Sequence, residues 1–454
     1  MQDKQPTGRR RRRAEPTHGH GHGHGPAGPA SARVRKLLLI LLLPLVLATA
    51  VGAVLLYPFG ADQRTGAAIG LHQVPVQGDV TATAQGSCGG PEGGQPSGTG
   101  CVLVTVRMTD GAAEGRDIQV PVPDEPSTPK FAVGDAVVLA YSGTDPTNNQ
   151  SYQLVDFQRG LPLTVLAVLF AAAVLLLGRR QGLAALGALV LSFVVLILFV
   201  LPAILAGENP LTVAVVGAGL IMFVVLYLTH GLTARTSTAV LGTLVSLALI
   251  GALGAVFSAA ARLTGLDEDT ANLVSLLGHG IDTRGLLLAG ALIGALGVLD
   301  DVTVTQTSAV WELRRANPNL SWRELYAAGL RIGRDHMSSV VNTLVMAYAG
   351  AALPVLLAFS LSGRSLGEIL TAQQVAQEVV RTLVGSIGLV AAIPVTTALA
   401  ALVASKEKVP APEPAPEPEP AASVKPRRRQ ATRFTGDINT GYHPDKGPWT
   451  TPRG

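Results

Sequence analysis

Two adjacent carboxylates, Asp300 and Asp301, lie within an apolar run, residues 285–310, that is long enough to cross a membrane. An ionised Asp at the centre of a membrane helix costs on the order of 2.5 to 3.5 kcal/mol on insertion scales, so such residues usually face a bundle interior or a water-filled path. Two carboxylates this close repel each other when both are ionised, so we expect one of them to hold a proton or a cation. The chemistry predicted here is reversible binding of a proton or cation inside the membrane.

Helical geometry distributes these polar groups over two neighbouring ridges. Successive residues are turned by about 100°, which places Thr305 behind Asp301 and places Thr303 and Thr307 behind Asp300. At about 1.5 Å per residue, Asp301 lies roughly 14 Å from the cytosolic end of the run. The opposite face is expected to pack closely against another helix, because it is assigned three small residues, Gly290, Gly294 and Gly297.

Other apolar runs carry polar residues at a similar depth. Asn342 and Thr343 fall about 8 Å inside the seventh run, and Thr243 and Thr396 belong to the inner halves of the fifth and eighth runs. If these helices are neighbours, their polar groups form a vestibule that is open to the cytosol and ends at the acidic pair. The alternative is that the hydroxyls bond their own backbone and that Asn342 bridges two helices. The candidate ion or substrate path comprises Asp300, Asp301, Thr305, Asn342, Thr343 and Thr396.

The composition indicates an integral membrane protein. Of 454 residues, 48% are hydrophobic and only 15% are charged, and the apolar residues are clustered in runs without a polar face. A soluble chain of this length would alternate apolar and polar residues along its helices and strands. Eight runs approach the roughly 20 residues that a bilayer core requires. They cover residues 37–57, 161–177, 183–205, 211–228, 238–261, 286–310, 340–359 and 382–404.

Basic residues predict the orientation of these spans, because cytosolic loops are enriched in Lys and Arg. Five consecutive arginines occupy residues 9–13, and they are assigned to a solvated tail rather than to a nucleic-acid site. They precede the first span and hold the N-terminus in the cytosol, so residues 58–159 lie outside. Eight spans with both termini cytosolic then satisfy every short loop. The predicted organisation is a cytosolic tail (1–36), an anchor (37–57), an extracytoplasmic domain (58–160), a seven-helix membrane domain (161–404) and a second cytosolic tail (405–454).

The extracytoplasmic segment is the only candidate for a folded soluble domain. Period-two alternation predicts strands at residues 101–108, 117–122, 137–140 and 152–157, and a Gly134-Asp135 turn feeding a strand is typical of small closed barrels. The only two cysteines of the chain, Cys88 and Cys101, fall in this segment, where an oxidising compartment favours a disulfide over two free thiols.

Both tails have compositions that cannot bury a core. Four histidines alternate with glycine near the N-terminus, at His18, His20, His22 and His24. Their imidazoles could reach one Zn²⁺ ion from a flexible loop, and the alternative is adventitious binding by a cytosolic tail. No motif for a cofactor is present, and none is expected.

Two motifs resemble the YibE/F-like family of bacterial membrane proteins. They are Gly294-Ala-Leu-Gly-Val-Leu-Asp-Asp-Val and Asn342-Thr-Leu-Val-Met-Ala-Tyr-Ala-Gly, the second entered through Arg331-Ile-Gly-Arg. The order of anchor, exported β-rich segment and multi-helix domain is also similar to that family, from about residue 58 to residue 405. The resemblance implies an integral protein of the bacterial cytoplasmic membrane with uncharacterised activity. It places the family's acidic position at Asp301, whereas Asp300 occupies a position expected to be apolar in many relatives.

Two functions remain open at this stage. The first is a permease for an ion or small solute, in which the acidic pair binds a cation or proton. The second is a non-transporting scaffold whose extracytoplasmic domain binds a partner in the cell envelope. An intramembrane enzyme is not expected, because the chain lacks a His-Glu-x-x-His motif, a nucleophile elbow and a Gly-rich phosphate loop. Neither the substrate nor the oligomeric state can be read from the sequence.

Overall fold

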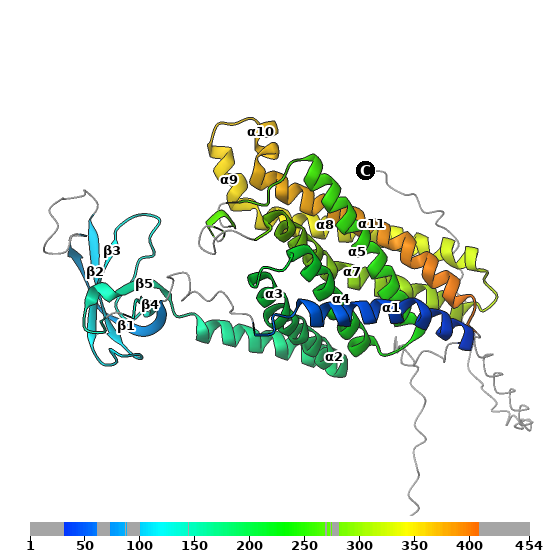
Figure 1. The fold of residues 1–454 in the computed structure, drawn as a ribbon, viewed down its shortest axis with the longest axis horizontal. Coiled ribbons are helices and arrows are strands. Elements are labelled where there is room, and N and C mark those ends of the chain that lie inside the picture. Colours follow the sequence, from blue (N-terminus) through cyan, green and yellow to red (C-terminus); the bar gives the residue numbers. More distant parts are fainter. Residues whose placement is uncertain are drawn as a thin grey trace, which may run out of the picture. The chain divides into compact units, whose positions relative to one another are not determined.

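The computed structural model describes residues 31–60, 73–86, 88, 100–143, 145–267, 270–272, 274 and 281–407. These residues form one small antiparallel sheet and a group of long apolar helices, both labelled in Figure 1. The four histidines of the predicted metal-binding tail lie outside the described residues, as does most of the second predicted tail.

The sheet has five strands in the order β3-β2-β1-β4-β5, and all neighbours are antiparallel. Its strands are β1 (Val74–Gly86), β2 (Cys101–Met108), β3 (Asp117–Pro123), β4 (Ala136–Tyr141) and β5 (Tyr152–Phe157), with a short 3₁₀ helix η2 (Asn149–Ser151) before β5. The edge strands β3 and β5 also contact each other, so the sheet curls toward closure. Alternate residues face one core, which contains Val80, Val104, Val106, Met108, Val137 and Leu139.

Four of these strands were predicted from alternation, and the central strand β1 was not. Its period is visible at Val74, Val76 and Val80 but is interrupted by Gly78. A glycine is required there, because a Cβ on Gly78 would lie 2.8 Å from the carbonyl oxygen of Arg107 on β2. Gly78 therefore weakens the strand pattern in the sequence, but it allows β1 and β2 to approach each other closely.

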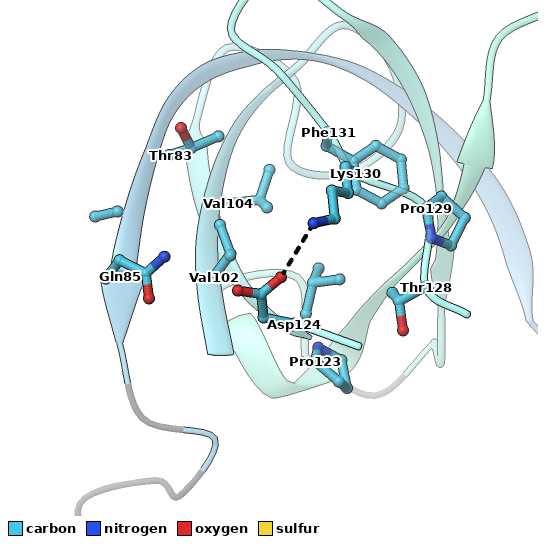
Figure 2. A pocket seen from close by; sticks show the side chains of 12 residues that line it. Thr83, Gln85, Val102, Val104, Pro123, Asp124, Thr128, Pro129, Lys130 and Phe131 are labelled. Carbon is cyan, nitrogen blue, oxygen red and sulfur yellow. Dashed lines mark ion pairs between the residues drawn. The ribbon is translucent and has the colours of Figure 1, made fainter. Parts of the chain in front are cut away.

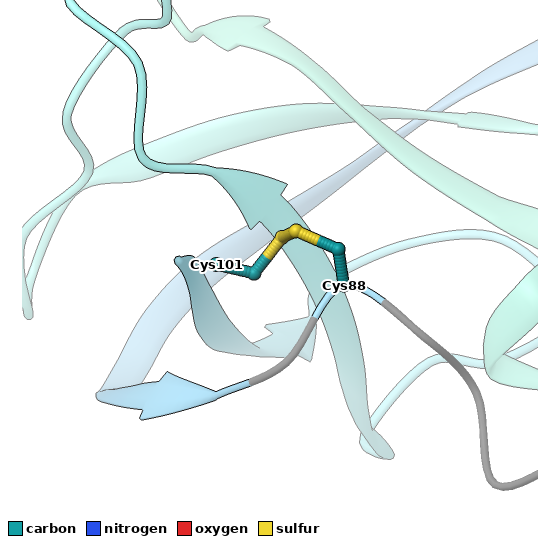
Figure 3. The surroundings of a disulfide bond; sticks show 2 residues. All are labelled: Cys88 and Cys101. Carbon is teal, nitrogen blue, oxygen red and sulfur yellow. A yellow bond between two sulfur atoms is a disulfide. The ribbon is translucent and has the colours of Figure 1, made fainter. Parts of the chain in front are cut away.

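A disulfide joins Cys88 to Cys101, with their Cα atoms 5.2 Å apart (Figure 3). Cys101 is the first residue of β2 and is almost fully buried, whereas Cys88 follows the end of β1. The bond closes a loop of about the size for which the chain-entropy model gives roughly 3 kcal/mol of stabilisation. It therefore fastens the connection between the two central strands.

The helices begin with α1 (Ala32–Leu56), α2 (Gly160–Val195), η3 (Leu196–Val200) and α3 (Leu201–Leu205). They continue with α4 (Pro210–His230), α5 (Ala234–Ala260), α7 (Thr283–Ala316), α8 (Trp322–Ala351), α9 (Leu353–Leu361), α10 (Leu366–Thr371) and α11 (Gln373–Ala404). Within the described residues, six helical segments are long and apolar enough to cross a membrane, or up to seven if the bent pair α8–α9 counts as one span.

The difference from the eight predicted spans arises at α2. Residues 160–205 count as one apolar segment of 46 residues, which would be about 69 Å long if it were straight. The backbone leaves helical geometry at Arg179, and a Cβ on Gly182 would lie 2.3 Å from the carbonyl oxygen of Val174. Residues eight positions apart in a straight helix are about 12 Å apart. The chain therefore turns back on itself at Arg179, between the two runs that the sequence separated.

Two apolar clusters fix which helix ends lie together. One cluster joins Val34 and Leu38 at the start of α1 to Trp311 on α7, Leu325 on α8 and Ala404 on α11. The other packs the end of α1, at Leu56, against residues of η3, α3 and α4. The beginning of α1, the α7–α8 connection and the end of α11 thus share one end of the helical group. We call it the Trp311 end.

Candidate functional site

The helices α5, α7 and α11 pack against one another and enclose a layer of buried hydroxyls. The hydroxyl oxygens of Thr243 on α5 and Thr303 on α7 are 2.8 Å apart. α5 and α11 approach closely at Gly242, where a Cβ would lie 2.3 Å from the hydroxyl oxygen of Thr396. This close approach requires a glycine and brings Thr396 against the helix that carries Thr243. The fully buried hydroxyl residues of this layer are Thr238, Thr243, Thr303, Thr307, Thr396 and Thr397.

Several of these hydroxyls bond the backbone of their own helix. Thr307 donates to the carbonyl of Thr303 at 2.7 Å, and Thr397 donates to that of Ile393 at 2.6 Å. These two residues therefore follow the alternative in which a hydroxyl bonds the backbone of its own helix. Such a bond satisfies the hydroxyl without any ligand. Thr396 differs, because its buried hydroxyl has no hydrogen-bond partner in the described part of the chain.

Asp300 turns into the helical group. Its Oδ1 atom is buried, and none of the described residues offers it a hydrogen bond. The neighbouring Thr303 hydroxyl lies 3.3 Å from the main-chain carbonyl of Asp300, so it does not satisfy the carboxylate. A buried carboxyl oxygen without a partner is energetically costly unless a proton, a cation or water occupies the site. Asp300 and Thr396 are the two predicted site residues that combine burial with an unsatisfied oxygen.

Asp301 lies on an exposed face of α7 that also carries Thr305. The three glycines predicted to lie opposite the acidic residues share this exposed face, since Gly290, Gly294, Gly297, Asp301 and Thr305 follow one another at intervals of three or four residues. The expectation that the glycines occupy a separate face was wrong, because it overlooked that spacing. The exposed face of α7 is therefore a stripe of small and polar residues.

Asn342 and Thr343 are also exposed, on the neighbouring helix α8. α8 runs antiparallel to α7, and the hydroxyl of Tyr348 lies 3.1 Å from the position of a Cβ on Gly294. The predicted residues thus separate into a buried set, Asp300 and Thr396, and an exposed set, Asp301, Thr305, Asn342 and Thr343.

Two polar features within the helices were not predicted. Gln306 on α7 is buried and donates from Nε2 to the carbonyl of Gly329 on α8 at 2.6 Å. Near the other end of α11, Glu378 and Arg381 form an ion pair of 3.1 Å beside the buried Gln377. The signal is present in the sequence, since a glutamine and an acid–base pair three residues apart precede the last apolar run, but these residues fall outside the predicted spans.

The curled sheet carries a pocket of about 330 Å³, lined by residues of β1, β2 and β3 and of the segment between β3 and β4, shown in Figure 2. Lys130 and Asp124 form an ion pair of 3.8 Å there, and Phe131 and Val104 contribute apolar surface. Gln85 and Val102, close to the two disulfide-bonded cysteines along the chain, also line it. In the described residues no group of three or more His, Cys, Asp or Glu side chains is placed to hold a metal ion.

The apolar helices are consistent with a membrane protein, and a small curled sheet accompanies them. The chain belongs to the YibE/F-like family, whose model matches residues 166–406. The match covers more than half of the chain and includes both motifs that suggested the resemblance. No curated protein and no solved structure matches the chain.

Proposed function

We propose that this protein is a permease for an ion or small solute, and that Asp300 binds the transported or coupled cation or proton. The observation that carries this proposal is the buried, unsatisfied Oδ1 of Asp300 within a helix of membrane-spanning length. The unsatisfied hydroxyl of Thr396 on α11 supports it. Both oxygens can coordinate a cation, and the carboxylate can also accept a proton.

The proposed topology has eight spans with both termini on the cytosolic side of a bacterial plasma membrane. The reversal at Arg179 supports two spans within residues 160–205, and the bent pair α8–α9 supplies one more. The shared position of the start of α1 and the end of α11 at the Trp311 end supports an even number of crossings. The basic residues Arg314 and Arg315 at this end favour its cytosolic placement.

Asp301 is given a separate role in this proposal. It lies on the exposed face of α7, and Asn342 is exposed on α8, so each side chain requires polar surroundings if it lies within the bilayer. Water or a second protein surface would supply them. The site of cation or proton binding is therefore assigned to Asp300 rather than to the pair.

The experiment compares three proteins in sealed liposomes: the wild type, Asp300→Asn and Asp301→Asn. Proton flux and the flux of monovalent and divalent cations are recorded with and without an imposed gradient. Asn keeps the size of the side chain but cannot carry the negative charge, so Asp300→Asn is expected to abolish flux. Asp301→Asn is the matched control, since it makes the same chemical change one residue away on the same helix.

Thermal unfolding and elution volume establish that each variant is folded before flux is compared. Loss of flux in Asp300→Asn with flux retained in Asp301→Asn supports the assignment. Equal loss in both variants assigns the site to the pair, and unchanged flux in Asp300→Asn contradicts the role of this residue. If the wild type conducts none of the tested ions, ion permeation is rejected.

A second candidate function is a scaffold whose sheet binds a partner in the cell envelope. The pocket in Figure 2 favours it, because it combines a charged pair with partly buried apolar side chains. Lys130→Ala and Phe131→Ala would then abolish the cellular phenotype of the protein, whereas Asp300→Asn would leave it intact. The permease proposal predicts the opposite result: Asp300→Asn abolishes the phenotype, and the two variants of the sheet leave it intact.

A further inference from the structure

A pocket of about 550 Å³ lies between α8–α9 and the first turns of α11. This volume is within the range of pockets that hold small organic ligands. Most of the wall is apolar, formed by side chains such as Val345, Leu356 and Leu383. α7 and α8 are antiparallel and the pocket lies near the end of α8, so it is at the end of the helical group opposite the Trp311 end.

The polar part of the wall offers hydrogen-bond donors that lack acceptors. Gln377 is 4% exposed, and its Nε2 atom has no hydrogen-bond partner in the described part of the chain. The Nε atom of Arg381, one turn further along α11, is also buried and without a partner there. An arginine can only donate, so this side of the pocket calls for an acceptor.

The charge of Arg381 is shared with one acid. Glu378 accepts from the Nη1 atom of Arg381 at 3.1 Å, and in the described residues the Nε atom of the same guanidinium has no acceptor. The other acid in the wall, Asp267, accepts a hydrogen bond from the amide of Thr270 at 2.7 Å. A planar carboxylate fits a guanidinium better than other small acceptors do, because it can accept two parallel hydrogen bonds.

We infer that this pocket binds a small carboxylate with an apolar body. The carboxylate accepts hydrogen bonds from Gln377 Nε2 and Arg381 Nε, and the apolar body lies against the walls contributed by α8 and α9. This site is distinct from the buried hydroxyl layer at Asp300, and its occupancy does not depend on the permease proposal.

Binding is tested on the full chain in lipid nanodiscs by calorimetric titration with hexanoate and with hexylamine. These probes share an apolar chain but differ in whether the head group accepts or donates. The wild type is expected to bind hexanoate saturably and to bind hexylamine at least tenfold more weakly. Dissolved acids and fatty acids in the bilayer share the same chemistry, so a third titration adds oleate, which enters the bilayer of the nanodisc. Saturable binding of oleate without saturable binding of hexanoate assigns the pocket to a lipid-derived acid.

Two variants remove the donors one at a time. Gln377→Met keeps the side-chain length and removes the amide, and Arg381→Lys keeps the charge that faces Glu378 but removes Nε. Each is expected to weaken binding of the carboxylate about tenfold, the effect of losing one hydrogen bond to a charged group. The matched control is Gln374→Met, the same change at an exposed residue of the pocket rim, with an expected effect below about twofold.

The variant Asp300→Asn separates this inference from the proposed permease, since it is expected to bind the carboxylate normally even if it conducts nothing. Three results would overturn the inference: no saturable binding of either acid, equal binding of acid and amine, or unchanged affinity in a folded Gln377→Met protein. Thermal unfolding of each variant without ligand shows whether it is folded.

Discussion

Thr243 on α5 and Thr303 on α7 join their helices through hydroxyl oxygens 2.8 Å apart, in the fully buried layer beside Asp300. Each hydroxyl also has a main-chain acceptor, the carbonyl of Ala239 at 3.1 Å for Thr243 and that of Asp300 at 3.3 Å for Thr303. Either hydroxyl can therefore act as donor or acceptor in the contact. The arrangement holds α5 against the turn of α7 that contains the buried acid.

We expect this contact to contribute a measurable coupling energy. Thr243→Val, Thr303→Val and the double variant form a double-mutant cycle, whose coupling should be about 0.6 kcal/mol, the average for hydrogen bonds between membrane helices. The change in unfolding free energy in detergent or bicelles gives the value. A second cycle that combines Thr243→Val with Thr397→Val is the control and should show no coupling, because in the described contacts the Thr397 hydroxyl bonds only its own helix. Additive effects in the first cycle would show that the two hydroxyls do not interact.

The close contact of α5 with α11 predicts a severe effect at Gly242. A Cβ there would lie 2.3 Å from the Thr396 hydroxyl, so Gly242→Ala is expected to destabilise the protein by about 1 to 3 kcal/mol, the usual range for overpacking. Gly290→Ala is the matched control, since no described atom lies within 4 Å of its Cβ position. The unfolding midpoint in detergent measures both.

The neighbouring Thr396 offers a compensating change. In a Gly242→Ala, Thr396→Ala protein the clashing hydroxyl is gone, and the nearest remaining atom of that side chain, Cβ, is 3.1 Å away. We expect this double variant to recover most of the stability lost in Gly242→Ala. A double variant as unstable as the single one would place the strain elsewhere along the α5–α11 contact.

The contrast between Asp300 and Asp301 shows what the sequence could establish. Hydropathy and the cost of a buried charge located the acidic pair in a spanning helix, and the structure contains that helix. Which acid faces inward depends on the packing of α4, α5 and α11 around α7, and no periodicity in α7 alone determines it. The family resemblance favoured Asp301, whereas the buried and unsatisfied oxygen belongs to Asp300.

Gln377 and Arg381 were missed for a related reason. They precede the most apolar part of α11, so a hydropathy window excluded them from the span, although the helix already begins at Gln373. Hydropathy finds the apolar centre of a helix better than its ends. The pocket itself depends on the 57° bend between α8 and α9, for which Pro354 in the first turn of α9 is a local signal.

The disulfide predicts that the sheet is sensitive to reduction. Replacing Cys88 and Cys101 by Ala should reduce the stability of the sheet by roughly 3 kcal/mol in the chain-entropy model. Hydrogen exchange of the β1 and β2 amides in the intact protein measures this loss locally. Reduced wild type should resemble the double variant, and amides of α5 should be unaffected by either treatment. Equal protection of β1 and β2 with and without the bond would contradict the prediction.

Glu407 predicts a pH-dependent stability at the Trp311 end of the helical group. Burial raises the pKa of this carboxyl above its ordinary value of 4.5, and the hydrogen bond from the Trp311 indole, 2.8 Å long, and the charge of Arg315 partly oppose the shift. A raised folded-state pKa means that the folded protein holds the proton more tightly than the unfolded chain does. The resulting stability is fully present below the ordinary pKa and is lost as the pH rises through the raised value.

The variant Glu407→Gln should therefore match the wild type in stability near pH 4.5 and exceed it near pH 8, because Gln can still accept from the indole but carries no charge. Thermal unfolding of both proteins across this range measures the difference. Glu368 is a control of opposite sign, since its pKa is lowered by hydrogen bonds that the backbone amide and the hydroxyl of Ser365, at the start of α10, donate to its carboxylate. Its stabilising effect is present above the ordinary pKa and is lost as the pH falls, so Glu368→Gln should be less stable than wild type near pH 8 and equal to it at low pH. Parallel unfolding curves for Glu407→Gln and wild type at every pH would mean that Glu407 titrates with the same pKa in the folded and the unfolded protein, which would contradict the prediction.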